Sequence, residues 1–270
     1  MKKLMFAASA AICATVGFAV DGVQSNNIVG YNMTKLEPGK YFIGAAQFED
    51  VESGTVDLNK VVSGLTSEPF DDEDVFLKTA PQIQIINAKG TYDIYYYLSD
   101  AYVVEGDNAG ARVEGWSNDV GEYADVKLTS GTAFWLKTNG ASDQNIVSGA
   151  VCGEDSVDVK IPQSSFKLVA NAFPMVLELN GPNVSCDGIA EIEFDDEDLF
   201  LTTAPQVQVQ KENGGYDVYY YLCNGWDESE SKRVPGWCDD VGCIVKPEVS
   251  VGRGFWAKGV SSDFTFSFSK

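Results

Sequence analysis

The sequence predicts an all-β protein built from two similar sandwich- or barrel-like domains. A 29-residue stretch at 70–98 returns at 194–222, and 19 of its 29 positions are identical without a gap. Short segments such as 81–85 and 206–210 alternate between apolar and polar residues, as half-buried strands do. No helical pattern runs longer than two turns. We therefore predict a tandem duplication of a β domain, with at most one short helix per repeat.

The predicted boundaries are 1–19 for a signal peptide, 20–150 for the first domain and 151–270 for the second. The leader has two lysines, an apolar run and a small-residue cleavage site ending at Ala19. No later stretch is long and apolar enough for a membrane span. We expect an exported protein that is extracellular, on the cell surface or in the periplasm.

The first predicted elements are strands at 27–35 and 41–48, joined by the turn at 37–40. The turn motif Lys-Leu-x-x-Gly-x-x-Phe at 35–42 recurs at 127–134, near the end of the repeat. We expect the first and last strand-turn-strand units of each repeat to pair and to close its sheet.

The repeated stretch predicts a short helix within 75–80, capped by Asp71 or Asp72 and ended by Pro81. Strand 81–85, a turn at 87–90 and a second strand should follow. That second strand places Tyr92, Ile94, Tyr96 and Leu98 on one face and Asp93, Tyr95 and Tyr97 on the other. The alternating Phe264, Phe266 and Phe268 predict a last strand at an edge or between the domains.

Charge and composition exclude several classes of function. The chain carries a net charge of −21 and has no basic stripe, which argues against nucleic acid as a partner. It contains no histidine, so Ser-His-Asp triads and the usual zinc sites are absent from the sequence.

Five cysteines remain after the predicted cleavage, all in the second repeat, where copy one has other residues at the matching places. In an exported protein they suggest up to two disulfides and one free thiol. We predict Cys223 and Cys238 as a pair because both flank the same loop.

Several motifs resemble those of uncharacterised exported repeat proteins from Verrucomicrobia-like and Planctomycete-like bacteria. They are SNNIVGY at 25–31, LVANAFP at 168–174, the Gln-Ile-Gln-Ile strand, Tyr-Asp-x-Tyr-Tyr-Tyr, Gly-Trp and Gly-x-x-Phe-Trp. The resemblance implies an exported bacterial β-repeat protein. It implies no activity and supplies no site residues.

Two acidic runs are candidate calcium sites, because Ca²⁺ takes several closely spaced carboxylate oxygens. The alternative is that one aspartate of each run caps the short helix while the others stay solvated. No other cofactor is expected. The candidate ligands are Asp71, Asp72, Asp74, Asp195, Asp196 and Asp198.

Tyrosine, tryptophan and glutamine side chains form a candidate carbohydrate site. Exposed aromatic rings stack on sugars, and amides bond their hydroxyl groups. The alternative is that both faces of the sheet are covered and the rings are core. The candidate residues are Tyr95, Tyr97, Gln82, Gln84 and Trp116 in copy one and Tyr219, Tyr221, Gln206, Gln208 and Trp237 in copy two.

Our leading prediction is a non-enzymatic surface, matrix or envelope interaction module, with a glycan or a surface protein as partner. The first alternative is a carbohydrate-binding module, with or without calcium. The second is a carboxylate-dependent glycoside hydrolase, which needs two opposed acids. Two repeats that keep the same acids fit two binding modules better than one shared active site.

Overall fold

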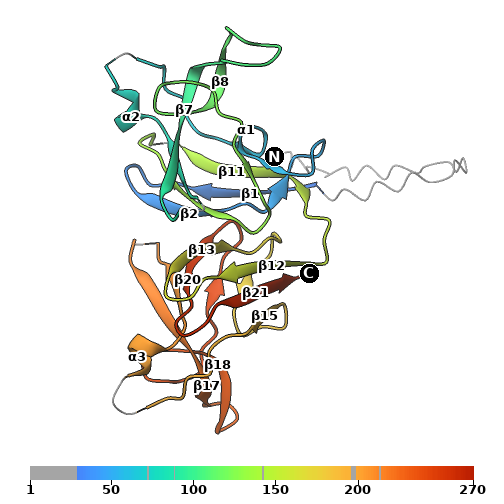
Figure 1. Ribbon diagram of the computed structural model, residues 1–270, viewed down its shortest axis with the longest axis vertical. Coiled ribbons are helices and arrows are strands. Elements are labelled where there is room, and N and C mark those ends of the chain that lie inside the picture. The colour runs from blue at the N-terminus through green and yellow to red at the C-terminus, as the bar shows by residue number, and fades with distance from the viewer. Residues whose placement is uncertain (1–28, 72, 88, 142, 196–198, 213) are drawn as a thin grey trace, which may run out of the picture.

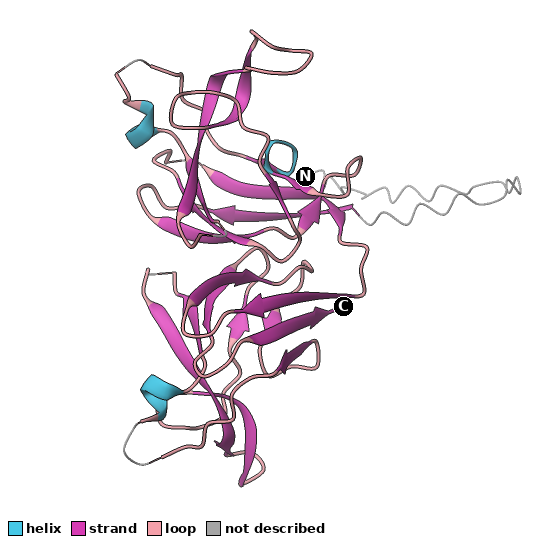
Figure 2. Cartoon of the chain, in the orientation of Figure 1, coloured by secondary structure: helices cyan, strands magenta, loops and turns pink. Residues whose placement is uncertain are grey.

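The computed structural model describes residues 29–270 apart from positions 72, 88, 142, 196–198 and 213. The predicted signal peptide at 1–19 lies outside the described residues. Strands dominate the described chain, and each of its three helices has four residues (Figure 2). The all-β prediction is confirmed. Within the described chain, no helix is both long and apolar enough to cross a membrane.

The first half, residues 29–151, contains two main antiparallel sheets and a short two-stranded one. The larger sheet has the order β2 (Tyr41–Ala45), β10 (Ala133–Lys137), β6 (Gln82–Ile86), β7 (Tyr92–Tyr102) and β8 (Arg112–Ser117). The smaller sheet joins β1 (Val29–Lys35), β3 (Phe48–Glu49) and β5 (Val62–Ser63) to β11 (Gln144–Val151). The short sheet pairs β4 (Val56–Asp57) with β9 (Lys127–Leu128), and α1 (Leu58–Val61) follows β4.

The second half, residues 152–270, repeats this layout. Its larger sheet has the order β13 (Phe166–Ala170), β20 (Gly254–Lys258), β16 (Gln206–Gln210), β17 (Tyr216–Asp227) and β18 (Lys232–Cys238). Its smaller sheet has the order β12 (Ser156–Ile161), β21 (Phe264–Ser269) and β15 (Val184–Asp187). A two-stranded sheet pairs β14 (Leu177–Glu178) with β19 (Glu248–Val249).

The two larger sheets also share their register. Gln82 pairs with Tyr96 in the first half, and Gln206 pairs with Tyr220 in the second. A shift in register follows Leu98 in β7 and Leu222 in β17. The predicted strands at 81–85 and 206–210 are therefore confirmed, and so is the helix before each of them, as α2 (Phe76–Thr79) and α3 (Phe200–Thr203).

The strands on either side of the turn at 37–40 do not pair with each other. β1 belongs to the smaller sheet and β2 to the larger one, so the turn, with Gly39 at φ 75°, carries the chain from one sheet to the other. The expected pairing of first and last units holds for β2 and β10 only, because β1 pairs with β11, which follows the last unit, and β9 pairs with β4. The larger sheet does not close on itself, since its order ends at β2 and β8.

The last strand lies inside the second half and not at an edge. β21 is the central strand of its sheet, between β12 and β15. Phe264, Phe266 and Phe268 all point into the core of the second half and are fully buried. The prediction of an edge position is wrong, because this aromatic face is covered by the larger sheet.

A buried amide without partners marks a weak point of the first half. Asn145 in β11 is fully buried, and neither polar atom of its side chain has a hydrogen-bond partner among the described residues. Asn145 occupies the position in the first half that Phe266 occupies in the second. In the matching sheets, Asn145 pairs with Thr34 and Phe266 pairs with Val159. An apolar side chain is therefore compatible with this position in the fold.

We predict that Asn145→Leu raises the free energy of unfolding by about 1–2 kcal/mol, because it removes two unsatisfied polar atoms at nearly constant shape. Urea denaturation measures the effect. The control is Asn108→Leu, at an exposed loop position where no change is expected. A loss of stability in Asn145→Leu would contradict the prediction and would mean that the amide is hydrogen-bonded.

The two halves pack against each other through the outer faces of their larger sheets, in a contact that we call the seam. In Figure 1, β2 of the upper half lies against β13 and β20 of the lower half. The apolar centre of the seam consists of Ile43, Ala45, Ala133, Leu168 and Ala170. Gly254 is needed there, because a Cβ at this residue would lie 2.7 Å from both Ala133 and Ile43.

The seam is self-complementary. Backbone bridges join Gly44 to Arg253 and Val169 to Thr132. By the registers of the two sheets, Gly44 and Val169 occupy equivalent positions in the two halves, and so do Thr132 and Arg253. The second bridge is therefore the counterpart of the first with the two halves exchanged. Such an arrangement is typical of the contact between subunits related by a two-fold axis.

Candidate functional site

The predicted glutamines and tyrosines lie on opposite faces of the larger sheets. Gln82 pairs with Tyr96 and Gln84 pairs with Ile94, so the glutamines share a face with the even-numbered residues of β7. Tyr95 and Tyr97 lie on the other face. A platform that combines these tyrosines with Gln82 or Gln84 is therefore wrong.

The face with Tyr95 and Tyr97 covers the core of the first half. Both rings are partly buried against that core, and the ring of Tyr97 lies 5.2 Å from that of Trp116. Tyr219 and Tyr221 are placed in the same way in the second half. Burial raises the pKa of Tyr97 and of Tyr221.

The predicted tryptophans are enclosed. Trp116 and Trp237 are fully buried, so neither ring is available to stack on a sugar. Their prediction as ligand residues is wrong, because the loops and the short sheet beside β8 and β18 close over them. They are core residues.

The glutamine face looks toward the seam, where it forms part of a groove of about 610 Å³ between the halves. We call this cavity the seam groove. It contains three aromatic rings, two side-chain amides and one ammonium group. Its lining residues are Lys40, Tyr41, Gln84, Trp135, Gln210, Gly214 and Tyr216.

The aromatic rings of the seam groove are held against one another. Tyr41 meets Trp135 edge to face, with ring centroids 5.9 Å apart. Trp135 in turn lies 6.1 Å from Trp256 of the second half. Burial raises the pKa of Tyr216. Tyr41 remains 42% exposed, so its ring offers surface to a ligand.

A hydrogen-bonded triangle places polar groups beside these rings. The Tyr41 hydroxyl donates to Gln82 Oε1 at 3.2 Å, and Gln84 Nε2 lies 3.2 Å from both oxygens. Within the described chain, no hydrogen bond to Gln84 Oε1 is formed, which leaves an acceptor for a ligand hydroxyl. The remaining predicted glutamines, Gln206 and Gln208, lie on the matching face of the second half, where Gln206 Nε2 donates to Leu201 O at 3.0 Å.

Gln210 connects the halves at the groove. Its side chain accepts a hydrogen bond from Ile43 N at 3.2 Å and donates one to Tyr41 O at 2.8 Å. The amide thus pairs with the backbone of β2 as a neighbouring strand would. This contact holds Tyr41 in place beside Trp135.

A second cleft of about 680 Å³ adjoins the seam groove and shares Lys40, Tyr41, Gln210 and Gly214 with it. We call it the adjoining cleft. Arg253 lies in this cleft, with its guanidinium carbon 4.3 Å from the centroid of the Phe42 ring. Burial lowers the pKa of Arg253, and the charge of Glu212 opposes that shift. An arginine remains protonated at neutral pH even so.

The acidic turns cap the short helices. Asp71 accepts backbone hydrogen bonds from Val75 N at 2.8 Å and Phe76 N at 2.9 Å, and these bonds lower its pKa. Asp195 accepts the matching bonds from Leu199 and Phe200. Asp72, Asp196 and Asp198 lie outside the described residues, and among those that are described no three His, Cys, Asp or Glu side chains group as metal ligands. Calcium binding at these turns stays a prediction.

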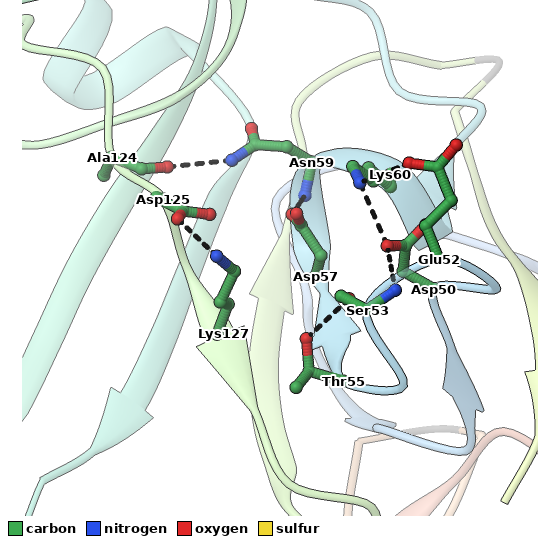
Figure 3. A network of polar contacts seen from close by, with 10 residues as sticks. All are labelled: Asp50, Glu52, Ser53, Thr55, Asp57, Asn59, Lys60, Ala124, Asp125 and Lys127. Atoms are coloured by element: carbon green, nitrogen blue, oxygen red, sulfur yellow. Dashed lines mark hydrogen bonds and ion pairs between the residues drawn. The ribbon is translucent and has the colours of Figure 1, made fainter. Parts of the chain in front are cut away.

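A polar network around α1 supports the fold (Figure 3). Asp57 caps α1 by accepting from Asn59 N, and Lys60 contacts Asp50 at 2.9 Å. The Asn59 side chain donates to Ala124 O and accepts from Trp116 N, each at 2.8 Å. Asn180 makes the same bond to Trp237 N at 2.8 Å, so both halves use an asparagine to fix the strand that carries the buried tryptophan.

The predicted disulfide between Cys223 and Cys238 is wrong. All five described cysteines are free thiols. Cys238 pairs with Tyr220 across the strands, whereas Cys223 lies three residues further along β17. Three residues of strand span about 10 Å, which is too far for a disulfide. Burial raises the pKa of Cys238 to about 12.

Sequence reasoning did not bring together the residues that line the groove. Tyr41 and Tyr216 each begin a strand, and Gln210 ends one. The only signal in the sequence is a difference between the repeats, since Ile86 stands in copy one where Gln210 stands in copy two.

Fold and groove together define an all-β protein of two matching halves with an aromatic and amide-lined groove between them. Comparisons of the chain with protein-family models, curated proteins and solved structures found no match. The resemblance to exported bacterial β-repeat proteins therefore stays a prediction.

Proposed function

We propose that the protein is an exported, non-enzymatic interaction module and that the seam groove binds a carbohydrate chain. The observation that carries this proposal is the lining of the groove, in which three aromatic rings and two amides from both halves line an open depression of about 610 Å³. Binding sites of this kind combine apolar surface with a few placed polar groups.

The groove supplies the two contacts that a sugar ring needs. The rings of Tyr41, Trp135 and Tyr216 offer flat apolar surface to the C–H faces of a pyranose. Gln84 Oε1 and the Tyr41 hydroxyl offer hydrogen bonds to its hydroxyl groups. Because Tyr41 and Gln84 already bond each other, they are oriented before the ligand arrives, which reduces the entropy lost on binding.

The lining favours binding over hydrolysis. Among the residues that the structure describes, no carboxylate lines the seam groove. In the adjoining cleft, two of the four acids that line it form ion pairs, Glu37 with Lys40 and Asp217 with Lys211 at 2.6 Å. Glycoside hydrolysis needs one acid kept protonated and a second opposed to it, and ion pairing favours the charged form instead. Calcium is not required by this binding mode.

The test is retention of the mature protein in gels that contain soluble polysaccharides. We predict that Trp135→Ala weakens binding at least about tenfold, which corresponds to about 1.4 kcal/mol. Gln84→Ala, which shortens a half-buried side chain, should weaken binding while leaving the fold intact. Circular dichroism and a thermal melt check the folding of each variant.

Two control variants locate the site. Trp226→Ala removes an exposed tryptophan at the far end of β17 and should bind as the wild type does. Tyr95→Ala tests the opposite face of the sheet and should also retain binding if the variant is folded. The proposal would be contradicted if the Trp135→Ala variant were retained as strongly as the wild type. It would also be contradicted if no polysaccharide retained the wild type. A chelator arm measures any calcium dependence.

A further inference from the structure

The guanidinium of Arg253 has hydrogen-bond donors that no described residue accepts. Its guanidinium stacks on Phe42 at 4.3 Å, yet within the described chain it donates no hydrogen bond and forms no ion pair. A guanidinium has five N–H donors in a planar fork that matches a carboxylate or sulfate. Leaving such a group half-buried and unpaired costs free energy, and an anionic ligand would offset that cost.

The position of Arg253 fits a ligand that also fills the seam groove. The adjoining cleft shares four lining residues with the groove, so one chain molecule can extend through both cavities. Sugar rings would lie against Trp135 and Tyr216, and a charged substituent would lie over Arg253.

The cleft is electrostatically unusual for this chain. Its lining carries four cations and four acids, which sum to zero, whereas the chain as a whole has a net charge of −21. Two of the acids are neutralised locally, since Glu37 pairs with Lys40 and Asp217 pairs with Lys211. Glu212 is the acid whose charge acts on Arg253.

Several of these groups are absent from the equivalent positions on the opposite side of the seam. The registers of the two sheets align the two tryptophans, Trp135 with Trp256, and the two glutamines, Gln84 with Gln208. Tyr216 aligns with Tyr92. Tyr41 aligns with Phe166, which meets Trp256 edge to face as Tyr41 meets Trp135. The groups without a chemical equivalent across the seam are Arg253, Phe42, Lys40 and Gln210, in place of which the opposite side has Thr132, Lys167, Ser165 and Ile86.

We infer that the ligand is an acidic saccharide chain, and that Arg253 binds its carboxylate or sulfate group while the rings of the seam groove hold its sugars. This inference rests on the proposed function and names the chemical class of the ligand. Packing of the seam does not require an arginine, since Thr132 fills the equivalent place.

The test compares each acidic polysaccharide with a neutral partner of the same backbone. Polygalacturonate against its methyl ester probes a carboxylate, and dextran sulfate against dextran probes a sulfate. We expect the wild type to bind one acidic member at least about tenfold more tightly than its neutral partner. The difference should shrink as salt is raised, because added ions screen the charge pair.

The decisive variant is Arg253→Thr, which installs the residue found at the equivalent position of the first half. It should lose at least about tenfold in affinity for the acidic ligand and keep the affinity for the neutral one. Arg253→Lys keeps the charge but not the fork and should fall between the two. The control is Arg233→Thr, at a second arginine that stacks on an aromatic ring but lies away from the seam. The guanidinium carbon of Arg233 is 5.3 Å from the centroid of the Phe194 ring. This substitution should change neither affinity.

Equal binding of acidic and neutral chains, or an Arg253→Thr variant that binds acidic chains as the wild type does, would overturn the inference. In that case the proposed function would still stand if the wild type binds the neutral chains and Trp135→Ala abolishes that binding. Failure of the wild type to bind any of the four polysaccharides would overturn both.

Discussion

Replacing Trp116 by alanine is expected to lower the free energy of unfolding by about 3–5 kcal/mol, the range for removing a large aromatic side chain from a packed core. Trp116 is fully buried between the two sheets of the first half, against Tyr97 and beside the backbone that Asn59 fixes. Trp237→Ala should cost a similar amount, because its ring stacks on Phe266 with centroids 6.0 Å apart. Urea denaturation followed by circular dichroism measures both.

The control for the tryptophan variants is Trp226→Ala, whose ring is 37% exposed. It should change stability by less than about 1 kcal/mol. If Trp116→Ala unfolded at the wild-type urea concentration, the ring would not be a core residue, and its place in a binding surface would have to be reconsidered.

Replacing Gln47 by leucine is expected to destabilise the seam by about 3 kcal/mol. Its buried side chain donates to Asn171 O at 3.1 Å and Phe173 O at 3.0 Å and accepts from Gly252 N at 2.8 Å. Leucine has a similar size but leaves Asn171 O and Gly252 N without partners among the described residues, whereas Phe173 O keeps the hydrogen bond from Met175 N. Each unpaired buried group costs about 1–3 kcal/mol when water cannot reach it.

The matched control is Gln163→Leu, in which an exposed glutamine loses one hydrogen bond to Ser261 O. Its effect should stay within about 0.5 kcal/mol. Hydrogen exchange adds a second readout, because loss of Gln47 should speed exchange at the seam amides of Ile43 and Gly252 before it affects the cores. Unchanged exchange at both amides would contradict the role assigned to Gln47.

The strands and short helices followed from local patterns. Alternation of apolar and polar residues fixed β6 and β16, and the acidic turn with Pro81 fixed α2. The faces of β7 were also assigned correctly, since Tyr96 and Leu98 point to one side and Tyr95 and Tyr97 to the other. These features depend on neighbours in sequence, which a single sequence contains.

The candidate site depended on contacts that a local pattern does not contain. A shift of one residue in the pairing of β6 with β7 would exchange the partners of the glutamines, and only the structure shows that Gln84 faces away from Tyr95. The groove itself joins residues far apart in the chain, such as Tyr41 and Gln210, which are 169 positions apart. Whether Cys223 lies opposite Cys238 depends on the same kind of register, and the structure places Tyr220 there instead.

The most direct measurement is a crystal structure of the protein with a bound oligosaccharide cut from an acidic polysaccharide that it retains. We predict sugar rings against Trp135 and Tyr216 and an acidic group within hydrogen-bond distance of the Arg253 guanidinium. An oligosaccharide bound on another surface, with the seam groove accessible in the crystal and empty, would contradict the assignment of the seam as the binding site.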